Sequence, residues 1–214
     1  MRNVAIMGNG PLTELPDLLQ YHDQIDIWIG ADRGALTIIE SGLPLTYAVG
    51  DFDSVSEIEK QTIQDKAEFF KQHPIEKDMT DFELALEQAF ELNPDTIYFF
   101  GVTGGRLDHT LINIQLLQHV IERNIRGILI NRTNELEMTK PGNHTVTQDE
   151  QYDTISFIPI TPKVTGLTLT NFYYPLTNAT VTIGSTLSIS NKLISNYGTF
   201  SYEEGIVLVV KSRD

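Results

Sequence analysis

Aspartates recur in short polar segments of this chain, and the spacing of one pair is suited to binding a divalent cation. Asp51 and Asp53 are separated by one residue in Gly50-Asp51-Phe52-Asp53-Ser54, so an extended chain would place both carboxylates on the same side. Adjacent carboxylates repel unless a cation lies between them, and such oxygens favour magnesium, calcium or manganese. The alternative is a polar loop in which Asp53 or Ser54 caps the next helix.

Two further segments could add charged groups to the same site. Asp32 and Arg33 follow another apolar run, and the arginine could hold phosphate or form a surface ion pair. In Lys77-Asp78-Met79-Thr80-Asp81, two aspartates flank a threonine beside a lysine. These aspartates could complement the dipole at the beginning of a helix, or they could serve a metal–triphosphate site.

The segment Gly101-Val102-Thr103-Gly104-Gly105-Arg106-Leu107-Asp108-His109-Thr110 is typical of a phosphate-binding loop. It lies between an apolar strand and a helix, so amide groups made accessible by glycine could approach phosphate oxygens while Arg106 neutralises them. It lacks the Lys-Ser/Thr ending of a Walker A loop, and its glycine spacing is no dinucleotide fingerprint. An ordinary tight turn at Gly104-Gly105 is the alternative.

The elements expected to position these segments in residues 1–140 are alternating strands and helices, which predict an α/β domain with a parallel sheet. We expect strands at Val4–Met7, Ile25–Ile29, Tyr47–Val49, Phe69–Phe70, Ile97–Phe100 and Ile128–Ile130. Helices are expected at Leu36–Ser41, Asp81–Leu92 and Asp108–Arg123, with capping-box spacing of Thr80 and Glu83 before the second. In open α/β sheets, ligands bind beyond the carboxyl ends of the strands, where the aspartates should meet.

Residues 143–214 are richer in Thr, Ser, Ile, Val and Tyr, and they predict a small all-β sandwich domain after a connector at Pro141-Gly142-Asn143. Strands are expected at Thr154–Ile158, Ala179–Ile183, Thr186–Ser190 and Ile206–Val210. Ser188 and Ser190 would share one strand face, which could recognise a polar ring or simply be solvated. Tyr173 and Tyr174 could stack on a flat or cationic ring, or belong to the core and rim of the sandwich.

Composition limits the classes of partner. A formal net charge of −14 disfavours nucleic acid as the main ligand, although divalent cations could bridge the carboxylates to a phosphorylated small molecule. The absence of cysteine excludes disulfides, thiolate metal sites and cysteine nucleophiles. No apolar stretch is long enough to cross a membrane, so a cytoplasmic, membrane-free protein is expected.

Five segments in this order, GDFDS, KDMTDF, GGRLDH, YYPLTN and GSTLSISN, resemble those of the thiamine pyrophosphokinase (thiamine diphosphokinase) family over nearly the whole chain. The resemblance implies a Rossmann-like N-terminal catalytic, ATP-binding domain and a C-terminal thiamine-binding β-sandwich. It also implies a homodimer with active sites at the interface. The implied reaction converts ATP and thiamine to AMP and thiamine diphosphate with Mg²⁺.

Taken together, the motifs and this resemblance give a set of expected site residues. The expected catalytic residues are Asp51, Asp53, Asp78, Asp81 and Asp108, of which Asp51, Asp53 and Asp78 would bind the metal. The expected ATP- or phosphate-binding residues are Asp32, Thr80, Gly104, Arg106 and Asp108. The expected thiamine-binding residues are Tyr174, Ser188, Ser190 and Asn191. Tyr174 stands where some relatives place a tryptophan, and Arg33 stands where relatives often have glycine.

The proton acceptor and the reaction class have alternatives. Asp78, Asp81 and Asp108 are equal candidates to accept the proton of the thiamine hydroxyl. A nucleotide-sugar-dependent glycosyltransferase could use Asp51-Phe52-Asp53 to hold its metal. A nucleotide or thiamine sensor would bind these ligands without turnover.

Overall fold

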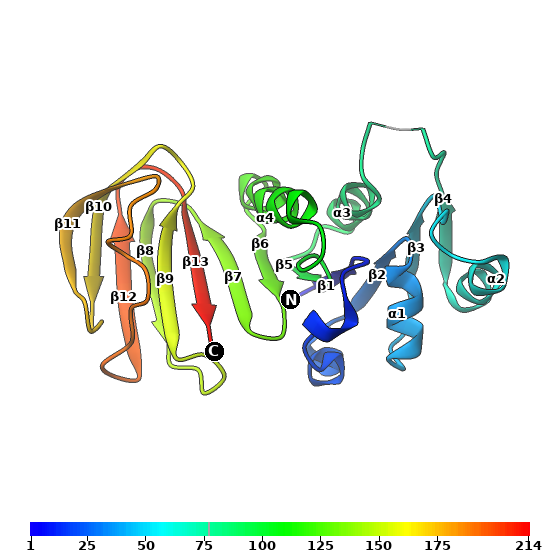
Figure 1. Cartoon of the computed structure of the whole chain (residues 1–214), viewed down its shortest axis with the longest axis horizontal. Helices are drawn as coiled ribbons and strands as arrows, with labels where there is room; N and C mark the ends of the chain where they lie inside the picture. The colour runs from blue at the N-terminus through cyan, green and yellow to red at the C-terminus, as the bar shows by residue number, and fades with distance from the viewer. Residues whose placement is uncertain (77) are drawn as a thin grey trace. The chain divides into compact units, whose positions relative to one another are not determined.

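The computed structural model describes residues 1–76 and 78–214, and the chain divides into two units, Met1–Arg132 and Thr133–Asp214 (Figure 1). In the described residues, no helix is both long and apolar enough to span a membrane. Each unit has its own hydrophobic core.

The first unit contains six parallel strands in the order β4-β3-β2-β1-β5-β6. Their bounds are β1 Asn3–Met7, β2 Ile27–Ala31, β3 Tyr47–Gly50, β4 Phe69–Gln72, β5 Thr96–Phe100 and β6 Arg126–Ile130. Strands β1 to β4 lie next to one another in chain order, and β5 then pairs with the opposite edge of β1. Ligands of open α/β sheets bind at such a reversal of strand order.

Helices cover both faces of this sheet. Their bounds are α1 Gly34–Glu40, α2 Glu57–Lys66, α3 Asp81–Glu91 and α4 Leu107–Glu122, with short 3₁₀ helices at Leu12–Glu14 and Leu18–Gln24. Ile38 of α1 shares a core with Phe100, whereas Phe82 of α3 packs edge-on against Phe99, with ring centroids 4.9 Å apart. Because neighbouring strand residues face opposite sides, α1 and α3 cover opposite faces.

The three predicted helices are confirmed with shifts of one or two residues at their ends, but α2 was not predicted. This helix is mostly polar, and Ile63 is its one buried residue, so its sequence has little apolar periodicity. Its beginning did carry a signal, because Ser56 and Glu59 form a complete capping box.

The second unit is a β-sandwich. Its strands are β7 Asn134–Thr139, β8 Gly142–Thr147, β9 Thr154–Pro159, β10 Lys163–Thr170, β11 Leu176–Thr182, β12 Tyr197–Tyr202 and β13 Val207–Ser212. One antiparallel sheet has the order β7-β13-β9 and the other β11-β10-β12-β8. Phe157 of the first sheet packs against Phe200 of the second, with ring centroids 4.9 Å apart, within a core to which both sheets contribute.

Two features of the second unit differ from the sequence-based expectations. The division of the chain precedes β7, because β7 pairs along its whole length with β13, and Pro141 therefore lies inside the unit instead of connecting two domains. The expected strand at Thr186–Ser190 is wrong: the segment is a series of turns, and Ser190 has a left-handed backbone with φ of 54°. Its polar and apolar residues alternate as in a strand, but the segment forms turns, and an isolated bridge between Ile155 and Asn191 follows it.

Candidate functional site

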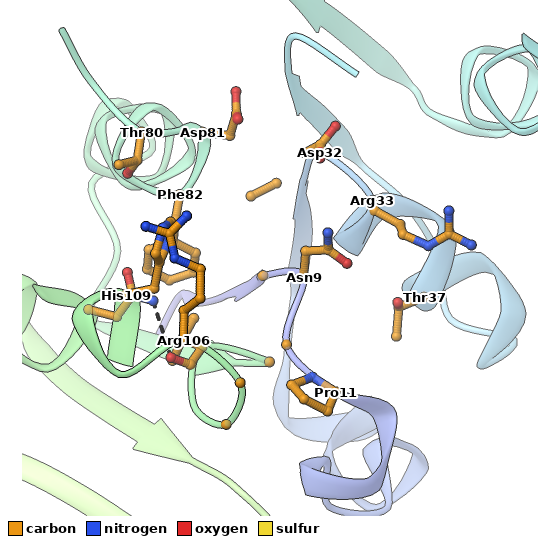
Figure 2. A pocket seen from close by; sticks show the side chains of 18 of the residues that line it. Asn9, Pro11, Asp32, Arg33, Thr37, Thr80, Asp81, Phe82, Arg106 and His109 are labelled. Atoms are coloured by element: carbon orange, nitrogen blue, oxygen red, sulfur yellow. Dashed lines mark hydrogen bonds between the residues drawn. The ribbon is translucent and has the colours of Figure 1, made fainter. Parts of the chain in front are cut away.

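A cavity of about 750 Å³ lies in the first unit, beyond the carboxyl ends of β1, β2 and β5 (Figure 2). Figure 2 shows Asn9 and Asp32 on one side of it, and Thr80, Phe82 and Arg106 on the other. The cavity is therefore located where the strand order reverses, as expected for a ligand site in an open α/β sheet.

Glycines allow the loops after β1 and β5 to meet beside this cavity. The Gly8 amide donates to the Phe100 carbonyl at 2.8 Å, and the Gly10 amide donates to the Gly101 carbonyl at 2.7 Å. A Cβ atom on Gly8 would lie only 2.6 Å from the Gly101 oxygen. Larger residues would therefore separate the two loops that border the cavity.

Three carboxylates converge at the ends of β2 and β3. Asp32, Asp51 and Asp53 each offer an oxygen within 4.8 Å of the others, which is close enough for one cation to bind all three. The segment is not extended, because Phe52 has a left-handed backbone with φ of 61°. The buried Phe52 ring stacks on Phe70 at 4.6 Å and anchors the loop between the two aspartates.

Asp32 has one carboxylate oxygen that is satisfied and one that is not. Oδ2 accepts a hydrogen bond from the Ser54 hydroxyl at 2.5 Å. Oδ1 is buried and has no hydrogen-bond partner among the described residues. Burial raises the pKa of the Asp32 carboxyl above its usual value; hydrogen bonds from Ser54 and the Arg33 backbone oppose this rise, and the nearby Asp81 and Asp51 charges add to it. This oxygen is suited to a cation, which would relieve both effects.

The Asp81 side chain is connected to this group by a hydrogen bond from the Asp51 backbone, whereas Asp78 is not part of the group. The Asp81 carboxylate accepts a hydrogen bond from the Asp51 amide at 3.2 Å, and Asp81 also lines the cavity. Thr80 is the N-cap of α3, where its hydroxyl accepts from the Glu83 amide at 3.2 Å. Asp78 is exposed and is not part of the converging group, so its role as a metal ligand stays a prediction. Lys77 lies outside the described residues.

Arg106 and Asp108 form an exposed ion pair at the beginning of α4. Nη2 and Nε of Arg106 donate to the two Asp108 oxygens at 2.6 and 3.2 Å. Hydrogen bonding from Arg106 is the main reason that the pKa of Asp108 falls to about 2. Left-handed glycines at 104 and 105 turn the chain ahead of this pair, and Arg106 lines the cavity.

The Arg33 side chain forms an ion pair with a residue of helix α2. Its guanidinium binds Glu59 of α2 at 2.9 Å and donates weakly to the Ser54 carbonyl at 3.5 Å. Figure 2 shows this side chain directed away from Asp32. Arg33 is thus held by an ion pair, which was the alternative considered for it from the sequence.

Sequence reasoning missed other residues that line the cavity. Asn9 lies between the two glycines that follow β1, and Gly-Asn-Gly after an apolar strand was a usable signal. Asn113 of α4 is buried and donates to the Val102 carbonyl at 3.1 Å, which fixes the loop after β5. Thr37 of α1 also borders the cavity, but nothing in the local sequence distinguishes it from any other half-buried helical threonine.

The residues expected to bind thiamine differ in accessibility. Ser188 and Asn191 are each only 1% exposed, and the Ser188 hydroxyl donates to the Phe157 carbonyl at 2.6 Å. The side chains of Ser190 and Tyr174 are exposed. Of these four residues, Tyr174 and Ser190 are therefore the accessible ones.

Comparison with known proteins gives two family matches that together span most of the chain. Residues 18–129 match the model of the thiamin pyrophosphokinase catalytic domain, and residues 143–207 match that of the thiamin pyrophosphokinase vitamin B1 binding domain. The first match contains the converging carboxylates, and the second contains Tyr174 and Asn191.

Individual relatives agree with these matches. A thiamine pyrophosphokinase of Bacillus subtilis is 44% identical over 214 residues, which cover all of both chains. The crystal structure of thiamine pyrophosphokinase from that organism superimposes with a TM-score of 0.94 over 100% of both chains. A thiamin pyrophosphokinase structure from Geobacillus thermodenitrificans is 41% identical, with a TM-score of 0.89 over 99% of this chain and 98% of the other. This chain belongs to the thiamin pyrophosphokinase family, whose members are enzymes.

Proposed function

We propose that this protein transfers the pyrophosphoryl group of ATP to the hydroxyl of thiamine, giving thiamine diphosphate and AMP. Membership of the family supports the reaction. The observation that carries the proposal to this chain is the convergence of Asp32, Asp51 and Asp53 beside a cavity large enough for a nucleotide. Clustered carboxylates at the rim of such a cavity are favourable when a divalent cation bridges them to the phosphates of the substrate.

The residues present fit a magnesium ion. All three converging groups offer hard oxygen ligands, and the buried Asp32 Oδ1 lacks a hydrogen-bond partner among the described residues. We assign the metal to Asp32, Asp51 and Asp53, with Asp81 and Asp78 as further candidates. When bound, Mg²⁺ neutralises phosphate charge and orients the triphosphate.

In the proposed reaction, the thiamine hydroxyl oxygen forms a bond with the β-phosphorus of ATP. The bond between that phosphorus and the oxygen bridging to the α-phosphate breaks, and AMP leaves with its electron pair. Transfer of this kind depends mainly on positioning and charge stabilisation. Arg106 lines the cavity and would neutralise phosphate oxygens, and the loops after β1 and β5 would offer backbone amides.

Asp81 is the favoured acceptor for the hydroxyl proton. It lines the cavity and lies next to Asp51, whereas Asp108 is held ionised by Arg106 with a pKa of about 2. A carboxylate with so low a pKa is a weak base at neutral pH. Asp78 is exposed near the same helix end and is the second candidate.

The decisive assay measures AMP formed from ATP and Mg²⁺ with and without thiamine. We expect AMP release that depends on thiamine, and a fall of about 100-fold or more in Asp51→Asn or Asp53→Asn. Asp23→Asn, at a fully exposed aspartate, is the matched control and should keep full activity. Release of a nucleoside diphosphate with a sugar acceptor would indicate a glycosyltransferase, and binding without turnover would indicate a sensor.

The proposal also includes a homodimer with shared active sites and a cytoplasmic location. Exposed apolar side chains at Leu107, Leu111 and Ile112 of α4 support self-association, because such patches commonly mark protein interfaces. Sedimentation at several protein concentrations would test the dimer, and fractionation of the source cells would test the location.

A further inference from the structure

Asn191 is enclosed by hydrogen bonds to the backbone of two other segments. Its amide donates to the Ile155 carbonyl at 2.9 Å, and its carbonyl accepts from the Ile155 amide at 2.8 Å. Its side-chain Oδ1 accepts from the Tyr174 amide at 2.9 Å, and Nδ2 donates to the Tyr174 carbonyl at 2.8 Å. With 1% exposure, this side chain cannot contact a ligand at the surface.

The segment that carries Asn191 is attached to β9, the edge strand of its sheet within the second unit. Phe157 exchanges two hydrogen bonds with Ser188: its amide donates to the Ser188 carbonyl, and its carbonyl accepts from the Ser188 hydroxyl. The Ser190 amide donates to the Ser156 hydroxyl at 3.0 Å. The turn at 188–191 is therefore fixed to β9 at three successive positions, Ile155 to Phe157, and Asn191 is held rigidly.

Tyr174 depends on this attachment for its position. Tyr174 is 57% exposed, and its ring stands edge-on to the Tyr173 ring, with centroids 4.9 Å apart. The next residue is Pro175, which has no amide hydrogen to donate. The two hydrogen bonds between Tyr174 and the Asn191 side chain hold this backbone, together with one from the Tyr173 amide to the Lys192 carbonyl at 2.8 Å.

We infer that Asn191 is a positioning residue, which fixes the Tyr174 backbone so that the exposed ring is presented to thiamine, and that it does not itself contact thiamine. The inference rests on the proposed function and on the expectation from the sequence that Tyr174 binds thiamine. The role differs from the thiamine contact expected for Asn191, because Oδ1 and Nδ2 of its side chain both form hydrogen bonds with the Tyr174 backbone. Ser190, whose side chain is exposed, is left as the accessible polar group of the same turn.

Steady-state kinetics test how Asn191 acts. Asn191→Ala should raise KM for thiamine about tenfold, the effect of losing roughly 1.4 kcal/mol of hydrogen bonding, while KM for ATP stays unchanged. The same substitution made in Tyr174→Ala should add nothing, because the ring that it positions is gone. Effects that multiply would mean that Asn191 acts on thiamine independently of Tyr174, and would overturn the inference.

Matched variants separate positioning from loss of folding. Asn143→Ala, at an exposed asparagine of the same sandwich, should leave both KM values unchanged. Asn191→Asp keeps an acceptor for the Tyr174 amide but places a carboxylate oxygen against the Tyr174 carbonyl, so it should also raise KM for thiamine. Thermal unfolding identifies any variant that fails to fold. If Asn191→Ala does not fold, Asn191→Asp takes its place. Its effect on KM for thiamine is then compared in the unsubstituted protein and in Tyr174→Ala, and it should add nothing in the latter.

A fluorescence measurement that does not depend on enzymatic activity completes the test. Tyr174→Trp places a fluorescent ring at this position, and the signal of the buried Trp28 is subtracted by using the unsubstituted protein. Time-resolved anisotropy should show a faster and wider local motion when Asn191→Ala or Asn191→Asp is added. Unchanged motion would overturn the inference while leaving the proposed function intact. If the unsubstituted protein released no thiamine-dependent AMP, the proposed function would fail, and the anisotropy would still decide whether Asn191 fixes position 174.

Discussion

At the scale of single residues, the site depends on an aspartate whose environment is unfavourable without a cation. Asp32 has a left-handed backbone with φ of 51°, is 8% exposed, and has one buried oxygen without a hydrogen-bond partner among the described residues. Residues held in such conformations commonly occur at functional sites. The energetic cost of this buried, unpartnered oxygen is explained if a metal ion binds to it and replaces the missing hydrogen bond.

Asp32→Asn should stabilise the metal-free protein while abolishing activity. Burial raises the pKa of Asp32, so its ionisation makes folding less favourable as pH rises through that pKa. A neutral asparagine removes this cost, keeps an acceptor for Ser54 and tolerates a positive φ. In EDTA at pH 7, we expect a Tm about 2–4 °C higher than that of the unsubstituted protein.

The metal dependence supplies the control. Mg²⁺ should raise the Tm of the unsubstituted protein and have little effect on Asp32→Asn. Equal stabilisation of both proteins by Mg²⁺ would contradict the assignment of Asp32 to the metal.

Asp108→Asn should reduce activity about tenfold or less, which is below the contribution of a general base. With a pKa of about 2, Asp108 stays ionised and paired with Arg106 throughout the neutral range. Its loss would leave Arg106 less well oriented without removing a proton acceptor. The pH–rate profile above pH 5 should keep its shape. A loss above about 1,000-fold with the acid limb removed would instead make Asp108 the base.

At the scale of secondary-structure elements, close approach of α1 to β1 sets the position of the loop that carries Asp32. Gly34 is the first residue of α1, and a Cβ atom there would lie 2.1 Å from the Met7 carbonyl oxygen. The helix can therefore begin only where no side chain is present. Gly50 has a similar role between β3 and the next loop, since its Cβ would lie 3.1 Å from the Asp32 backbone.

Gly34→Ala should destabilise the protein by about 3 kcal/mol or more, because the new methyl group meets backbone atoms that cannot move independently. Urea denaturation would measure the change in the free energy of unfolding. Gly184→Ala is the comparison: Gly184 has open space around its Cβ and a φ of 84°, so only the left-handed backbone cost of about 1 kcal/mol is expected. Similar losses for both variants would show that contact with Met7 is not limiting.

At the scale of the whole molecule, acidic charge governs association with other molecules. The chain has a formal net charge of −14 and a sequence pI of about 4.6. Such a surface repels polyanions, so the magnesium proposed at the carboxylate site would be what allows a triphosphate to approach.

Solubility should therefore be lowest near pH 4.6 and should rise toward neutral pH as net charge grows. Light scattering across pH 4 to 8 would measure it. DNA added at physiological salt should produce no change in sedimentation at pH 7. Salt-sensitive binding to DNA at that pH would show that a local basic surface outweighs the overall charge.

The sequence was sufficient to predict the α/β class of the first unit, the β class of the second, the six parallel strands and three of the helices. These follow from local patterns, since strand and helix periodicity and capping signals lie within short windows. It also determined the family, because five motifs in order are specific even though each is weak alone. The polar helix α2 and several sandwich strands were not found, since their apolar periodicity is weak or short.

Which side chains meet at the site could be seen only in the folded chain. Asp32 was expected to bind phosphate, but it converges with Asp51 and Asp53, because the parallel order of β2 and β3 places both strand ends together. Ser188 and Asn191 were expected to face a ligand, but their turn is bonded to β9 and buries them. Burial and hydrogen-bond partners depend on segments far apart in the chain, and local spacing cannot specify them.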